Sequence, residues 1–285
     1  MNARTMSLRG RSKGRQAANS SAMDAAARWG FMARGTIYLL IGLLALQIAF
    51  ADVGGGGGGG GGEQADRGGA LAEIGEQPMG SVLLWALGVG LVGMSLWRLS
   101  EALFGASGPD GRKASKRLLS AGRFVFYGFV AYSVLTFAAG DKSGSSGDQQ
   151  SQDITATAME QPGGRWIVGI AGAAIIGAGL WIAVRALRRD YHKHLKLSQM
   201  SRRVRQFVDV TGVGGGVARG VLFGGIGVFV LQAAIEYEPD KAKGFDATLR
   251  SFADAPAGRW LLALVALGLV LFGVFSFAMA RWRKV

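Results

Sequence analysis

Two stretches far apart in the chain share one pattern: GFMARGTIYLLIGLLALQIA at residues 30–49 and GGVARGVLFGGIGVFVLQAA at residues 215–234. Both carry Ala-Arg-Gly, an aromatic residue three positions later, another glycine and a glutamine near the end. Each stretch has the length, about 20 residues, that a helix needs to cross the hydrocarbon core of a bilayer. The pair therefore predicts two equivalent transmembrane helices and an internal repeat.

Further apolar runs with almost no internal charge occur between and after these two stretches. Backbone groups in lipid must bond within their own segment, and the runs lack the alternation of barrel strands, so each run predicts a helix. The mean hydropathy of +0.26 agrees with a membrane protein. The sequence predicts an all-α membrane protein with six transmembrane helices, at residues 31–50, 79–97, 124–139, 166–184, 213–235 and 261–280. The third run is short and is expected to begin nearer Ala121.

The second, fourth and sixth runs open alike, with EQPMG at 76–80, EQPGG at 160–164 and DAPAG at 254–258. Proline fits the first turn of a helix, so each motif predicts a helix start. The third run, from Gly122, keeps only Gly128 and the aromatic character of the odd spans. Three tandem helix pairs with a pseudo-three-fold arrangement follow, at residues 28–105, 118–190 and 205–284, after a basic arm, 1–27, without fixed structure.

These repeated odd spans, each followed by an acidic loop and an E-Q-P-x-G start, resemble the bacterial membrane proteins of the family called domain of unknown function 1206. The resemblance covers residues 28–284, and its poorest match is the second odd span. It implies three tandem pairs of transmembrane helices over the whole chain. It implies no activity, because the family supplies none.

The connections before the even spans leave one alternative open. Apolar residues there recur at helical spacing, so each connection forms either a short helix on the bilayer surface or an irregular loop. The nine glycines at 54–62 lie in the first of these connections. No Lys-Ser/Thr follows them, as a phosphate-binding loop requires, so they are interpreted as a flexible connection.

Charge is unevenly divided between the two sides of the predicted membrane. Most of the 32 Lys and Arg residues fall in the N-terminal arm, the second and fourth connections and the tail. Lys and Arg near span ends stay in the cytoplasm, which predicts cytoplasmic termini in a bacterial inner membrane. The net charge of +13 therefore reflects topology, and no nucleic-acid partner is predicted.

Small residues at four-residue spacing predict where helices pack closely, because lipid supplies no hydrophobic force between them. The expected packing residues are Gly216, Gly220, Gly224, Gly169 and Gly177.

Residues for chemistry are scarce. The chain has no cysteine, and its two histidines fall in one basic loop. Asp190, His192 and His194 lie near each other in sequence, but positions i and i+2 diverge on a helix and their neighbours are basic, which disfavours a metal site. No catalytic residues, no cofactor and no metal are predicted, and the protein is not expected to be an enzyme.

Two functional hypotheses remain. The first is a non-catalytic protein that organises anionic lipid on the cytoplasmic face or an unidentified membrane partner. The second is a small-solute channel or facilitator built from parallel repeats. Under the first, the headgroup-binding residues are Arg188, Arg189, Arg202, Arg203, Arg34 and Arg219. The basic residues of the fourth connection have a simpler explanation as well, in which they do no more than fix the topology.

Overall fold

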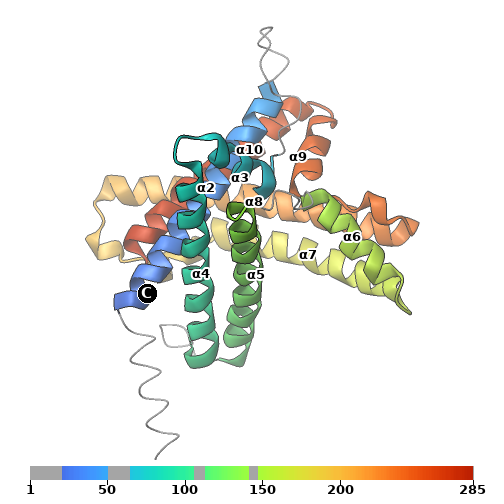
Figure 1. Cartoon of the computed structure of the whole chain (residues 1–285). Helices are drawn as coiled ribbons and strands as arrows, with labels where there is room; N and C mark the ends of the chain where they lie inside the picture. The colour runs from blue at the N-terminus through green and yellow to red at the C-terminus, as the bar shows by residue number, and fades with distance from the viewer. Residues whose placement is uncertain (1–20, 51–64, 106–112, 141–146, 285) are drawn as a thin grey trace, which may run out of the picture. The chain divides into compact units, whose positions relative to one another are not determined.

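The computed structural model describes residues 21–50, 65–105, 113–140 and 147–284 (Figure 1). The chain forms two compact units. Unit 1 contains residues 1–34, 78–142 and 276–285, and unit 2 contains residues 35–77 and 143–275. Residues 1–20 of the predicted arm and the nine-glycine run lie outside the described residues. Residues 21–27, which were predicted to be part of the arm, are helical.

Six helices are long and apolar enough to cross a membrane, which confirms the six predicted spans. Their ends lie beyond the apolar runs. The third helix, for example, begins at Ala114 and has 25 residues, so it is not short. The bounds are Ser21–Phe50 for α2, Gly80–Phe104 for α4, Ala114–Ala138 for α5, Gly164–Leu187 for α7, Arg202–Glu236 for α8 and Gly258–Trp282 for α10.

A short helix precedes each even span, so the open choice between helix and loop is decided in favour of the helix. These helices are α3 (Arg67–Glu76), α6 (Gly147–Met159) and α9 (Phe245–Ala253). All three belong to unit 2.

The proline motif forms a turn rather than the first turn of a helix, which corrects the prediction. The residue after each proline is left-handed, with φ of 66° at Met79, 76° at Gly163 and 58° at Ala257. The Gly164 N–H donates to the Gln161 carbonyl at 2.8 Å. Proline followed by a left-handed residue is the signature of a type II turn. The three even spans, α4, α7 and α10, therefore begin at the glycine two residues after the proline.

That glycine is required by the turn. A Cβ at Gly164 would lie 2.0 Å from the Ala158 carbonyl oxygen, and one at Gly258 would lie 2.0 Å from the Ala253 carbonyl oxygen. The short helix therefore folds back against the start of the long one, with no room for a side chain. The motif thus specifies a sharp corner between α6 and α7 and another between α9 and α10.

The even helix of one repeat packs against the odd helix of the next. Figure 1 shows α4 beside α5, and α7 contacts α8 along most of its length. A Cβ at Gly179 of α7 would lie 2.6 Å from the Gly220 oxygen of α8. The equivalent contact joins α10 to α2, where a Cβ at Gly273 would lie 2.8 Å from the Gly35 oxygen. The third repeat therefore packs on the first through the same pair of positions.

The α7–α8 and α10–α2 interfaces share a second pair of equivalent close contacts, about two turns further along the odd helix. A Cβ at Gly227 would lie 2.7 Å from the Ile176 nitrogen, and one at Gly42 would lie 2.8 Å from the Val270 nitrogen. The α7–α8 and α10–α2 interfaces are therefore equivalent at two levels, as a pseudo-three-fold arrangement requires. Between α4 and α5 the close position is Gly88, whose Cβ would lie 2.4 Å from Leu135 Cδ2.

The predicted packing glycines differ in what they contact. Cβ atoms at Gly216 and Gly220 would collide with α7, at 2.4 Å from Ala186 Cβ and 2.7 Å from the Gly179 oxygen. Gly224 belongs to the same interface, because a Cβ at Gly179 would lie 2.7 Å from its nitrogen. A Cβ at Gly169 would make only an ordinary contact, 3.8 Å from Ala234 Cβ. Cβ atoms at Gly177 and at Gly224 itself would meet no described atom within 4 Å.

Replacing Gly220 by Leu should destabilise the protein by more than about 3 kcal/mol, because α8 would have to move away from α7. Gly177→Leu is the matched control, since its Cβ position is open. Thermal unfolding in detergent should show a large loss for Gly220→Leu and a small change for Gly177→Leu. Equal stability of the two variants would show that the α7–α8 contact does not hold the fold together.

Candidate functional site

The basic loop between α7 and α8 is ordered and compact. It contains two 3-10 turns, Asp190–His194 and Leu197–Gln199. The chain leaves α7 through a left-handed residue, Arg189, with φ of 53°. It enters α8 through Ser201, whose side chain accepts a hydrogen bond from the Val204 N–H at 3.4 Å. Serine at this position is a preferred helix N-cap.

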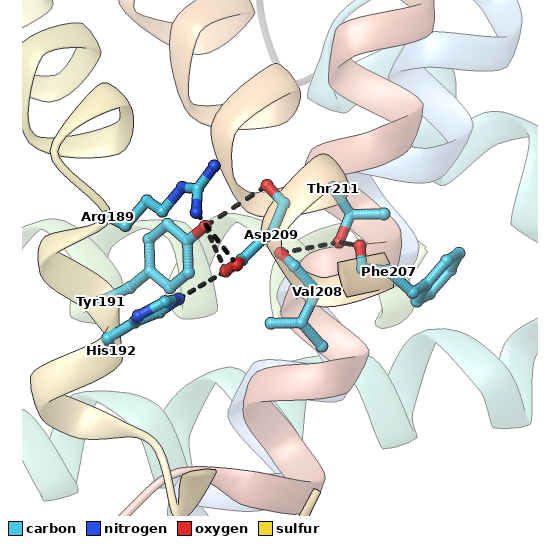
Figure 2. Close-up of polar contacts among 7 residues, drawn as sticks. All are labelled: Arg189, Tyr191, His192, Phe207, Val208, Asp209 and Thr211. Carbon is cyan, nitrogen blue, oxygen red and sulfur yellow. Dashed lines mark hydrogen bonds and ion pairs between the residues drawn. The ribbon is translucent and has the colours of Figure 1, made fainter. Parts of the chain in front are cut away.

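Asp209, near the start of α8, fastens this loop (Figure 2). The Tyr191 hydroxyl donates to Asp209 Oδ1 at 3.1 Å, and an Arg189 nitrogen lies 3.4 Å from Oδ2. His192 Nε2 also contacts Oδ1. The carboxylate therefore links three residues of the loop to α8. Burial, together with the charge of Asp209, raises the pKa of Tyr191, so this hydroxyl remains a donor at physiological pH.

The Tyr191 ring packs against apolar groups of α8 and α10. It packs edge to face against Phe275 of α10, with ring centroids 5.0 Å apart. A Cβ at Gly212 would lie 2.8 Å from Tyr191 Cζ and 2.9 Å from Phe275 Cε2. Glycine at this position therefore lets the tyrosine approach α8 closely. The stretch containing Gly212 serves helix packing here.

Two of the three residues considered for metal binding, Asp190 and His192, have different partners in the structure. His192 contacts Asp209, whereas Asp190 faces Lys193 at 3.1 Å and Arg185 at 3.4 Å. The hydrogen bond from Lys193 is the main cause of a lowered pKa at Asp190. Among the described residues, no group of three or more His, Cys, Asp or Glu side chains is placed to hold a metal ion.

Four of the arginines predicted to bind headgroups are exposed around this loop: Arg188, Arg189, Arg202 and Arg203. Large apolar side chains beside them are also exposed, to 61% at Leu187, 56% at Phe207 and 64% at Val210. An apolar surface bordered by arginine matches the boundary between hydrocarbon and headgroups. The loop therefore brings together the features expected of a membrane-surface site.

The other two predicted residues, Arg34 and Arg219, lie elsewhere and have protein neighbours. In unit 2, the Arg219 guanidinium lies 5.7, 5.3 and 5.0 Å from the ring centroids of Tyr38, Phe223 and Phe272. In unit 1, Arg34 Nε donates to Ser276 Oγ at 3.2 Å. Each of these two arginines therefore has neighbours within its own unit.

A second cluster, the carboxylate ring, joins the N-terminal ends of the three short helices. We give this name to Asp66, Asp148 and Asp246. Asp66 accepts a hydrogen bond from the Gly147 N–H of α6 at 2.9 Å, and Asp148 accepts one from the Ala247 N–H of α9 at 3.0 Å. Asp246 accepts one from the Ala65 N–H, next to α3, at 2.8 Å. Each repeat thus binds the next through one carboxylate.

The ring has an electrostatic cost. Burial raises the pKa of Asp148, two backbone N–H donors oppose the shift, and the charges of Asp246 and Asp66 add to it. Arg250 forms an ion pair with Asp246, in which Arg250 Nε lies 2.8 Å from Asp246 Oδ2. Carboxylates at helix N-termini accept otherwise unpaired N–H groups and interact favourably with the helix dipoles. The carboxylate ring therefore holds the N-terminal ends of the short helices together, at the cost of repulsion among three acidic side chains.

Comparison with known proteins agrees with the architecture. The family model Domain of Unknown Function (DUF1206) matches residues 29–105, 120–189 and 214–283. The chain belongs to the DUF1206 family. It is 30% identical over 251 residues to "Uncharacterized protein YxxB" of Bacillus subtilis (strain 168), with 87% of each chain covered. No solved structure matches it significantly.

Sequence reasoning missed the carboxylate ring of this DUF1206 protein. The three acids lie 12, 14 and 10 residues before their prolines, so alignment of the repeats on proline does not superpose them. One signal was present: each of the three acids precedes or opens a short segment with apolar residues at helical spacing. An acidic residue there is typical of a helix N-terminus.

Asp148→Asn should keep an oxygen acceptor for Ala247 and remove one of the three charges. A raised native pKa stabilises the fold below the ordinary Asp pKa and loses that contribution as pH rises through the native pKa. The wild type should therefore become less stable from acidic toward neutral pH, and Asp148→Asn should weaken this dependence. Thermal unfolding between pH 4 and pH 8 tests it, with the exposed Asp153→Asn on the same helix as the control. Identical pH profiles for Asp148→Asn and wild type would contradict the expectation.

Proposed function

We propose that this DUF1206 protein is a non-catalytic protein of the bacterial inner membrane that binds and organises anionic lipid at its cytoplasmic face. The observation that carries the proposal is the border at the α7–α8 loop. Four exposed arginines there adjoin the exposed apolar side chains of Leu187, Phe207 and Val210. In this proposal both termini are cytoplasmic and no cofactor takes part, and an unidentified membrane protein partner is the alternative to lipid at this face.

Two further observations support a membrane position for this loop. Trp166 near the start of α7 and Trp260 near the start of α10 are 76% and 67% exposed, as expected for tryptophans at the opposite interface. From Trp166 to Arg188, α7 has the length of one bilayer crossing. An arginine border at the end of such a helix meets phosphate groups of the lipid.

The loop is also prepared to hold its arginines in place. The contacts of Tyr191 and His192 with Asp209 fix the backbone next to Arg189 and Arg188. A fixed loop loses less conformational entropy on binding than a flexible one. A larger part of the favourable free energy between each arginine and the anionic surface therefore remains as binding free energy. Each basic residue near such a surface contributes about 1 kcal/mol.

Changing Arg188, Arg189, Arg202 and Arg203 together to Gln should remove most of the anionic lipid that copurifies with the protein. Native mass spectrometry after extraction from membranes containing phosphatidylglycerol measures the retained lipid. Lys113→Gln with Lys116→Gln is the control, because these two exposed residues at the start of α5 lie outside the loop. Unchanged lipid retention in the fourfold variant would refute the proposal and favour a channel or facilitator.

The topology can be tested separately. A reporter fused after Lys284 that is active only in the cytoplasm should be active, and one that works only outside should be silent. The fourfold Gln variant should keep this orientation, because the remaining basic residues still favour it. The opposite reporter result would place the basic loop outside and remove the anionic inner leaflet as its partner.

A further inference from the structure

Arginines of unit 1 gather around one aromatic pair. Phe31 of α2 and Trp97 of α4 pack edge to face, with ring centroids 5.5 Å apart. The Arg34 guanidinium lies 4.9 Å from the Phe31 centroid, and that of Arg98 lies 4.2 Å from the Trp97 centroid. Arg283, just after α10, contacts both rings, at 5.0 and 4.7 Å. We call these three arginines the arginine cluster.

The carboxylate of Glu101 is hydrogen-bonded to Arg98 of the cluster. An Arg98 nitrogen donates to Glu101 Oε2 at 2.6 Å, and Ser120 Oγ donates to the same oxygen at 3.3 Å. Arg98 and Glu101 are only 4% and 8% exposed. The negative charge of Glu101 therefore compensates the positive charge of Arg98, and this ion pair is shielded from water.

Positive charges surround Arg283. Burial lowers the pKa of Arg283, and the charges of Arg98, Arg34 and Arg123 lower it further, while Glu101 acts in the opposite direction. These groups come from α2, α4, α5 and the residue after α10, so positive charge converges from four parts of unit 1. Such a focus of like charge is relieved most directly by an anion.

Within the part of the chain that the structure describes, two donors of the cluster have no acceptor. Among the described residues, the Nε atoms of Arg98 and Arg283 are buried without a hydrogen-bond partner. Buried N–H groups are nearly always bonded in proteins, so an unbonded pair beside an excess of positive charge points to a missing acceptor. Planar guanidinium groups match oxyanions with two parallel hydrogen bonds.

We propose that the arginine cluster is a binding site for a phosphate group. A phosphate offers acceptor oxygens in several directions, which suits arginines arriving from different helices. A planar carboxylate offers two oxygens on one side and fits this convergence less well. The phosphate belongs either to a lipid headgroup or to free phosphate. The site is independent of the α7–α8 loop, so it goes beyond the proposed function.

The Arg98–Glu101 pair of the cluster is not a product of the repeat. Aligning the three prolines places Ile182 and Ser276 at the position of Arg98, and Arg185 and Met279 at the position of Glu101. Close helix packing is kept in the other repeats without this pair of charges, as the contacts of α7 with α8 show. The Arg98–Glu101 pair is therefore an addition to the first repeat that helix packing does not require.

The first test uses inorganic phosphate and the full chain in neutral detergent. Phosphate should raise the thermal unfolding temperature of the wild type at constant ionic strength, and Arg283→Gln should weaken the apparent affinity by about tenfold or more. Arg281→Gln, an exposed arginine two residues away, should behave as the wild type. This outcome identifies free phosphate as a ligand.

The second test uses nanodiscs containing phosphatidylglycerol and native mass spectrometry. Loss of one tightly bound lipid in Arg283→Gln, retained in Arg281→Gln, identifies a headgroup phosphate. If Arg283→Gln fails to fold by circular dichroism, Arg34→Lys replaces it, because lysine keeps the charge but loses the planar fork. Equal behaviour of these variants and the wild type with both probes overturns the proposal. The fourfold loop variant keeps all three cluster arginines, so failure at one site is distinguishable from failure at the other.

Discussion

The close contact between neighbouring helices is the constraint on which the rest of the structure depends. Lipid tails are as apolar as leucine side chains, so helices in a bilayer gain little from burying apolar surface and must gain from backbone approach instead. The first half of α2 packs on α4, where a Cβ at Gly30 would lie 2.4 Å from Met94 Cβ. The second half packs on α10, where a Cβ at Gly42 would lie 2.8 Å from the Val270 nitrogen. One odd helix thus carries a contact within its own repeat and a contact between repeats.

Sequence alone predicted the six helices and the three pairs, because apolar length and the repeated motifs report directly on membrane crossing. The predicted helices were too short, because charged residues near the helix ends interrupt the apolar runs. Arg98 and Glu101 therefore fell outside the predicted second span, although both lie within α4. Their grouping with Arg283 depends on contacts between distant segments, which hydropathy does not encode.

The proline motif shows a different reason for failure. Proline is compatible with both a first helical turn and the second position of a type II turn, and local preference does not separate the two. What decides is the glycine that follows, which is needed where the short helix folds back. The glycines at 164 and 258 are explained by that corner and would be unexplained by a plain helix start.

The carboxylate ring and the arginine cluster differ in how they depend on the repeat. The carboxylate ring uses one acid from each repeat, so it stabilises the shared architecture and its chemistry is that of helix N-termini. The Arg98–Glu101 pair of the arginine cluster is replaced in the other repeats by Ile182, Ser276, Arg185 and Met279. Buried charge is costly in a membrane protein and is not needed to pack these helices. The departure from the repeat is therefore the stronger indication of a specific ligand.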